Sequence, residues 1–183
     1  NKNAGFLLGE FLVFDRRGQY ITHLFSPKIK QLFVLILLHS LDGKGIGSKK
    51  ISARLWPDKD LPKTKNIKGV TFNHLRSIIA DIDGIELVFL NDSYSFTFQE
   101  SFFCDYCLLA AMVRDGGSIA DHLPLIARGT LLEDMPEALL EDVKPVFEEQ
   151  LLGLLGPELR KRYETGEYKQ VLEMAKLILG MDA

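Results

Sequence analysis

The sequence predicts an α+β N-terminal half followed by an all-α C-terminal half, and three observations carry this prediction. Residues 6–25 are rich in β-branched and aromatic residues around a turn signal, which is typical of strands. Residues 27–98 contain three stretches of helical length and then a period-two hairpin pattern. Beyond residue 99 only helical stretches follow. We therefore place a boundary near residues 99–103, between domains 1–100 and 101–183.

The first elements are two strands at Phe6–Phe14 and Gln19–Phe25, separated by the turn Asp15–Gly18. Ser26–Pro27 then supplies an N-cap and a first-turn proline for a helix that runs to Leu41. This helix is apolar almost all round, which predicts that it is the buried central helix.

A second helix, Lys49–Trp56, follows the cap Ser48. A third runs from the cap Thr64 to about Asp83. The strands Ile85–Leu90 and Tyr94–Phe98 alternate around an Asn-Asp turn, which predicts a hairpin. The order strand, strand, three helices and hairpin predicts a winged helix-turn-helix, with the hairpin as its wing.

The second half is predicted to be helical throughout. The expected helices are Phe102–Arg114, Ser118–Ala127, Pro136–Leu155, Pro157–Glu164 and Gly166–Met181.

Composition and charge limit the classes of protein. The 183 residues are 46% hydrophobic and 26% charged, with a net charge of −3, which is an ordinary globular balance. Residues 1–100 carry 14 Lys and Arg against 10 Asp and Glu, whereas residues 101–183 carry 8 against 15. This asymmetry favours one part that binds a polyanion and one that binds a partner. The acids of the second half form either a solvated face or a partner surface.

The cysteines and the apolar runs indicate the cellular compartment. Cys104 and Cys107 are the only cysteines, which favours a reducing compartment. The longest apolar run, Leu32–Leu38, is far shorter than the roughly 20 residues that span a bilayer. We therefore expect a cytoplasmic chain. Because it begins with Asn1 rather than Met, we expect it to be a segment of a longer protein, whose preceding part could hold a sensor or a membrane anchor.

The third helix has the composition of a helix that reads DNA. Its apolar residues gather on one side, and the opposite side carries Asn66, Gly69, Asn73 and Ser77. Asn can make a bidentate contact with adenine, and Gly allows close backbone approach. Lysines near its start could neutralise phosphates. For this segment by itself, an ordinary amphipathic surface helix is the alternative.

Three segments within residues 6–98 resemble the OmpR/PhoB-type winged helix, in the SARP-like variant of bacterial activators. LLGEFLVFD with SPKIKQLFVLILL resembles the family's strand and Pro-led first helix. ISARLWPD resembles its second helix, which ends in Leu-Trp-Pro, and NIKGVTFNHLRSII resembles its recognition helix. The resemblance implies a bacterial transcription regulator that binds duplex DNA through a helix in the major groove.

The candidate site residues combine the helical pattern with this resemblance, which implies that Asn66, Val70, Asn73 and His74 face base edges. The base-reading candidates are Asn66, Gly69, Val70, Asn73 and His74. The phosphate-binding candidates are Lys28, Lys49, Lys50, Lys63, Lys65, Lys68, Arg76 and Ser77.

The wing and the second half qualify this interpretation. The wing LVFLNDSYSF contains no Lys or Arg, although the family wing commonly carries a basic residue. We therefore expect weak binding by one copy and a homodimer on DNA. RYETGEYKQVLEMAKLILGMDA resembles part of the tetratricopeptide-like activator domain of SARP-like regulators, which implies contact with RNA polymerase or another regulator. A generic helical bundle is the alternative there. For the whole chain, the alternative is a winged-helix protein-interaction module that no longer binds DNA.

Enzyme chemistry has no supporting pattern. The lone Cys104-x-x-Cys107 pair has no second pair to complete a zinc site, so we expect a structural role. His23 and His39 lie in apolar runs and are interpreted as core or edge residues. No phosphate-binding Gly loop or hydrolase motif occurs. We expect no catalytic residue, metal, cofactor or small-molecule substrate.

Overall fold

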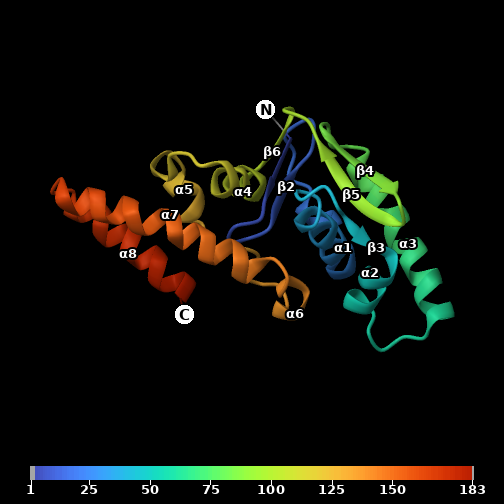
Figure 1. The fold of residues 1–183 in the computed structure, drawn as a ribbon. Helices are drawn as coiled ribbons and strands as arrows, with labels where there is room; N and C mark the ends of the chain where they lie inside the picture. Colours follow the sequence, from blue (N-terminus) through green and yellow to red (C-terminus); the bar gives the residue numbers. More distant parts are fainter. Residues whose placement is uncertain (1–2, 183) are drawn as a thin grey trace. The chain divides into compact units, whose positions relative to one another are not determined.

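The computed structural model describes residues 3–182, which form two compact units (Figure 1). Unit 1 comprises residues 3–5, Leu12–Phe103 and Met135–Glu141. Unit 2 comprises Phe6–Phe11, Cys104–Asp134 and residues 142–182. Helices and strands are both present, which confirms the predicted mixture of α and β structure. The chain crosses between the units more than once, because each unit includes a short segment from the other half of the sequence.

The N-terminal strands are shorter than predicted. A three-stranded sheet has the order β2-β1-β6, formed by β1 (Asn3–Phe6), β2 (Leu12–Phe14) and β6 (Phe102–Cys104). The single strand expected at residues 6–14 is wrong, because the backbone turns at Gly9. There φ is +72°, and a Cβ would lie 2.2 Å from the carbonyl oxygen of Arg128.

The second predicted strand, residues 19–25, is also wrong. Its centre is a short 3-10 helix, η1 (Thr22–Leu24). Asp15 forms the preceding turn, since its Oδ1 accepts hydrogen bonds from the backbone N–H groups of Arg17 (2.8 Å) and Gln19 (2.9 Å). The bond from Gln19 is also the largest cause that lowers the pKa of Asp15. Within residues 19–25, Tyr20 alone forms a β-bridge, which pairs it with Phe14 of β2.

Helix α1 (Pro27–Leu38) is the buried centre of unit 1, as predicted. Ser26 is its N-cap residue, and every side chain of Leu32–Leu38 is buried. The Phe33 ring lies 5.2 Å from that of Phe25 and 5.3 Å from that of Phe96. The helix ends three residues earlier than predicted, where Ser40 Oγ donates to the carbonyl oxygen of Ile36 at 2.6 Å.

Helices α2 (Ser48–Leu55) and α3 (Leu61–Ile79) follow. Helix α3 begins before the predicted cap Thr64, because Asp60 caps it and accepts from the N–H of Lys63 at 3.3 Å. Thr64 is instead buried within the first turn, where its hydroxyl donates to the carbonyl oxygen of Asp60 at 2.8 Å.

The predicted hairpin is confirmed. Strands β4 (Ile85–Leu90) and β5 (Ser93–Phe98) pair antiparallel, and β3 (Ile46–Gly47) adds to β5, which gives the sheet order β3-β5-β4. Asn91 and Asp92 form the two-residue turn, and both have positive φ (53° and 60°), as a type I′ turn requires.

Unit 2 is mainly helical. Its elements are α4 (Asp105–Asp115), η2 (Ile119–His122), α5 (Leu123–Ile126), α7 (Lys144–Glu164) and α8 (Tyr168–Asp182). The predicted helix start at Pro157 is wrong, since α7 continues through that residue. The stretch predicted as one helix from residue 136 is divided into α6 (Glu137–Leu140), which belongs to unit 1, and α7. None of the helices within residues 3–182 combines the length and apolar character needed to cross a membrane.

The carboxylate of Asp105 holds the N-terminal segment in unit 2. The side chain is fully buried, and its oxygens accept hydrogen bonds from the N–H groups of Leu7 (2.7 Å) and Leu8 (3.0 Å). Arg128 lies 3.3 Å from the same carboxylate and over the ring of Phe6. Burial raises the pKa of Asp105, while these hydrogen bonds and Arg128 act in the opposite direction.

We expect Asp105→Asn to lower the free energy of unfolding by about 1–3 kcal/mol, because the NH2 group that replaces one carboxylate oxygen cannot accept from the N–H of Leu7 or Leu8 and leaves a buried donor unpaired. Urea unfolding of the variant measures this loss. Asp121→Asn, at an exposed position of η2, is the matched control and should leave the midpoint unchanged. Equal midpoints for both variants would contradict the assigned role of Asp105.

Candidate nucleic-acid interface

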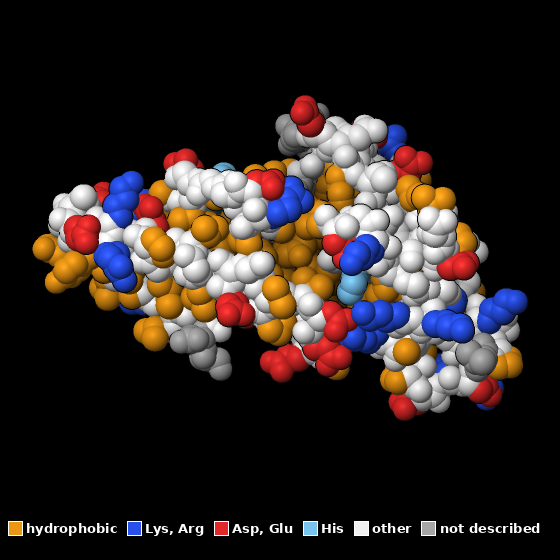
Figure 2. Space-filling model, viewed as in Figure 1, with side chains coloured by type: hydrophobic (Ala, Val, Ile, Leu, Met, Phe, Trp, Pro, Cys, Tyr) orange, Lys and Arg blue, Asp and Glu red, His pale blue; other side chains and the backbone are white. Residues whose placement is uncertain are grey.

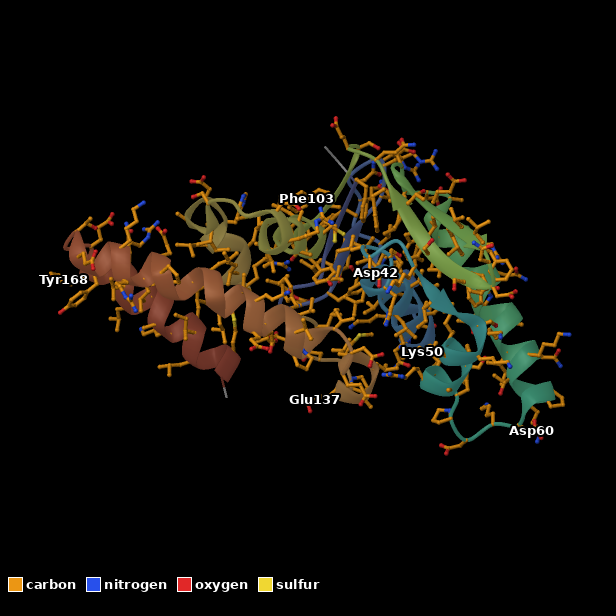
Figure 3. The ribbon with its side chains drawn as sticks, in the orientation of Figure 1. Asp42, Lys50, Asp60, Phe103, Glu137 and Tyr168 are labelled. Atoms are coloured by element: carbon orange, nitrogen blue, oxygen red, sulfur yellow. The ribbon has the colours of Figure 1, made fainter. Side chains whose placement is uncertain are left out.

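Helices α2 and α3 carry charge of one sign. Together they contain seven Lys and Arg residues, three in α2 and four in α3, and neither contains Asp or Glu. Lys and Arg side chains are visible over this part of the surface in Figure 2. Figure 3 labels Lys50 on α2 and Asp60 at the start of α3. A surface with this charge favours a polyanion.

One side of α3 packs into the core of unit 1. Phe72, Leu75, Ile78 and Ile79 are buried there, and α3 packs against α1. The opposite side faces solvent, and all five predicted base-reading residues are exposed on it: Asn66, Gly69, Val70, Asn73 and His74.

The exposed side of α3 offers unused hydrogen-bonding groups. The amides of Asn66 and Asn73 make no hydrogen bond with any residue that the structure describes. A Cβ added at Gly69 would meet nothing within 4 Å, so the backbone there is open to close approach. Val70 is 57% exposed although it is apolar. This side of α3 can therefore accept a ligand without first breaking its own contacts.

Most of the predicted phosphate-binding residues are also exposed. These are Lys28, Lys49, Lys50, Lys63, Lys65, Arg76 and Ser77. At least three have partners within unit 1. Lys28 donates to the carbonyl oxygen of Leu55, Ser77 Oγ donates to that of Asn73 at 3.1 Å, and the Arg76 guanidinium lies 5.6 Å from the Phe72 ring centroid.

Lys68 differs from the other lysines because it joins α3 to α2. Its Nζ donates to the hydroxyl of Ser48 and, at 3.2 Å, to that of Ser52. Desolvation lowers the pKa of Lys68, and the nearby charge of Lys65 adds to the effect. A contact between Lys68 and phosphate stays a prediction, while its contacts in the free protein position the two helices. Ser48 and Ser52 are four residues apart and therefore lie on one side of α2, which is the pattern that could have predicted a shared hydrogen-bond partner.

Arg54 faces a different neighbour. Its Nη1 donates to the carbonyl oxygen of Ala138 at 2.7 Å and lies 3.3 Å from a carboxylate oxygen of Glu141. This α2 residue therefore holds α6 rather than extending the exposed basic surface.

The wing presents apolar rather than basic side chains. Phe89 and Leu90 are 54% and 67% exposed, next to the turn residues Asn91 and Asp92. Sequence reasoning missed how the wing is attached: the ring of Tyr94 lies 4.4 Å from that of Phe72 on α3 and 4.6 Å from that of Phe89. The spacing of Tyr94, Phe96 and Phe98 along β5 predicts that their rings share one face of the strand. Only the fold shows that Tyr94 on this face contacts α3.

Cys104 caps α4. Its Sγ accepts from the N–H of Cys107 at 3.4 Å, and burial raises the pKa of the Cys104 thiol. Among the described residues, no group of three His, Cys, Asp or Glu side chains is placed to hold a metal ion.

Comparison with known proteins gives a fold likeness. No protein-family profile matches the chain, and no curated protein sequence matches it. The structure of Mycobacterium tuberculosis EmbR in complex with low affinity phosphopeptide superimposes with a TM-score of 0.53 and 15% sequence identity. The match covers 98% of this chain but 54% of the EmbR chain, so this chain spans about half of its length. At this identity the likeness shows a shared fold and nothing more.

We expect the Phe72–Tyr94 contact to couple the wing to α3 by about 0.5–1.5 kcal/mol, since aromatic pairs contribute this much beyond their buried area. A double-mutant cycle with Phe72→Leu and Tyr94→Leu, followed by urea unfolding, measures the coupling. Phe72 with Tyr163 of unit 2 is the control pair and should be additive. A coupling near zero for Phe72 and Tyr94 would show that the wing is not held by this contact.

Proposed function

We propose that this chain is part of a bacterial transcription regulator that binds duplex DNA through α3 in the major groove. The observation that carries the proposal is the exposed side of α3, where unbonded Asn amides lie among basic residues and no acidic residue of α2 or α3 opposes them. The fold shared with EmbR and the resemblance of residues 6–98 to SARP-like regulators support it.

Base recognition and phosphate binding have separate residues in this proposal. Asn66 and Asn73 are seven positions apart on α3, so their amides lie on the same side of the helix and can reach base edges in one groove. Lys63 and Lys65, near the N-terminus of α3, neutralise phosphates. Gly69 lets the helix backbone approach the groove between them.

Useful affinity requires more than one copy. The wing contributes no cation, so α3 and the residues around it must supply the electrostatic part of binding. Two copies on repeated half-sites raise the affinity through effective concentration. Unit 2, as a tetratricopeptide-like activator part, mediates this association or contact with RNA polymerase or another regulator.

Sequence preference should depend on Asn73. After selection of a preferred duplex from genomic fragments, we expect Asn73→Ala to cost roughly 1–3 kcal/mol on that duplex and much less on an unrelated one. Fluorescence anisotropy on both duplexes measures the difference. An equal loss on the two duplexes would mean that Asn73 reads no base.

Lys65→Ala should instead weaken binding to every duplex alike, and the slope of log K against log salt should fall by about 1. Lys169→Ala, at an exposed position of α8 in unit 2, is the control that removes the same charge far along the sequence from α3. If the wild-type chain shows no duplex binding at low salt, even as a forced dimer, the proposal fails.

A second candidate is a protein-interaction module that kept this fold without DNA binding. The exposed Phe89 and Leu90 on a wing without Lys or Arg favour it. Under this hypothesis a protein partner is retained in a pull-down after nuclease treatment, and Phe89→Ala releases it. Sequence-specific duplex binding by the wild-type chain would exclude this alternative.

A further inference from the structure

Strand β4 is an outer strand of its sheet, with β5 on one side only. Leu90 and Ser93 flank the two-residue turn and therefore form a hydrogen-bonded pair, so bonded pairs recur at every second residue of β4. The bond from the N–H of Gln99 to the carbonyl oxygen of Gly84, at 2.8 Å, continues this alternation. Even-numbered residues of β4 thus bond inward to β5.

The odd-numbered residues of β4 must point their backbone groups away from β5. These are Ile85, Leu87 and Phe89, and their N–H and C=O groups make no hydrogen bond with any residue that the structure describes. On the other side of the hairpin part of this alternation is satisfied, since the N–H of Phe96 donates to Ser40 Oγ at 2.7 Å and Tyr94 pairs with Ile46 of β3. Among the described residues, the outer edge of β4 has no hydrogen-bond partner.

The side chains of β4 do not prevent another strand from pairing with this edge. Its sequence, IELVFL, contains no Pro, Lys or Arg and a single charge, Glu86. Phe89 and Leu90 are more than half exposed. Proteins usually protect an exposed edge with Lys, Pro, a bulge or a covering element, because an open apolar edge pairs with another strand. This strand has a continuous register with β5, without a bulge, and it contains no Lys or Pro. Ile85 is buried at its start, so Leu87 and Phe89 form the more accessible part of the edge.

We propose that β4 pairs antiparallel with β4 of a second copy of this chain, with the two-fold axis at Leu87. In this register Leu87 faces Leu87, and Ile85 faces Phe89 of the second copy. All outward groups of these three residues are then satisfied in both copies, whereas a shift of the axis to residue 88 would satisfy fewer. Glu86 faces Val88 of the second copy, so the one charge in the strand does not meet itself.

This self-pairing goes beyond the proposed function and does not depend on it. It assigns a surface to association between copies, and it can be measured without DNA. Failure of the pairing would therefore leave DNA binding by α3 untested, and failure of DNA binding would not affect the pairing.

The first experiment compares two glutamate substitutions in the full chain by sedimentation velocity over a range of concentrations. Val88 and Ser95 are directly opposite, half-buried residues on one face of the hairpin, but only Val88 lies on the outer strand. Val88→Glu places a carboxylate opposite Glu86 of the second copy, where like charges repel. We expect a concentration-dependent dimer for the wild type, dimer dissociation at least tenfold easier for Val88→Glu, and little change for Ser95→Glu. A wild type that stays monomeric, or equal effects of the two variants, would overturn the proposal.

The second experiment tests the register and separates pairing from misfolding. Leu87→Pro removes only an outward N–H, so we expect an unchanged circular-dichroism spectrum and about tenfold weaker dimerisation. In a Cys107→Ser background, Leu87→Cys should cross-link to itself under mild oxidation, while Thr97→Cys on the inner strand should not. Equal cross-linking at both positions would place the contact between copies elsewhere.

Discussion

Burial of α1 on every side is the constraint on which unit 1 depends. Its apolar run leaves no face for solvent, so α2, α3, β5 and α6 must all pack around it. Helix α3 has one apolar side, and that side is used against α1. Its polar side is therefore left outside at a fixed orientation. The candidate interface is displayed because the core of unit 1 excludes any other placement of α3.

Charge and polarity are distributed unequally between helices α2 and α3 and the wing. Helices α2 and α3 carry only positive charge, while the wing carries exposed aromatic and aliphatic residues and an open strand edge. Tyr94 joins the two parts by contacting both Phe72 and Phe89. We infer a division of roles, in which α3 suits a polyanion and the wing suits a protein surface.

Errors in the strand prediction have local physical causes. Residues 19–25 are strand-like in composition, but the Asp15 turn and the Thr22 hydroxyl, which accepts from the N–H of Val13 at 2.8 Å, close the chain into a 3-10 helix. Residues 6–14 are divided because Gly9 adopts a left-handed conformation close to Arg128. Helix α3 begins earlier than predicted for a similar reason. Asp60 accepts a hydrogen bond at the helix start and is followed by a proline in the first turn, whereas Thr64 is not followed by one. The Asp15 turn and the Asp60 cap are local signals, whereas the approach of Gly9 to Arg128 is a long-range contact that the sequence does not specify.

The sequence by itself determined the order of helices and hairpin in unit 1, the central place of α1, and the exposed residues of α3. Periodicity and breakers suffice for these features, because they depend on which side of one element is apolar. Only the tertiary structure decided that Lys68 bonds to α2, that Tyr94 fixes the wing to α3, and that buried Asp105 holds Leu7 and Leu8. These contacts join residues 16 to 98 positions apart, and no pattern within one element specifies which distant group will meet it.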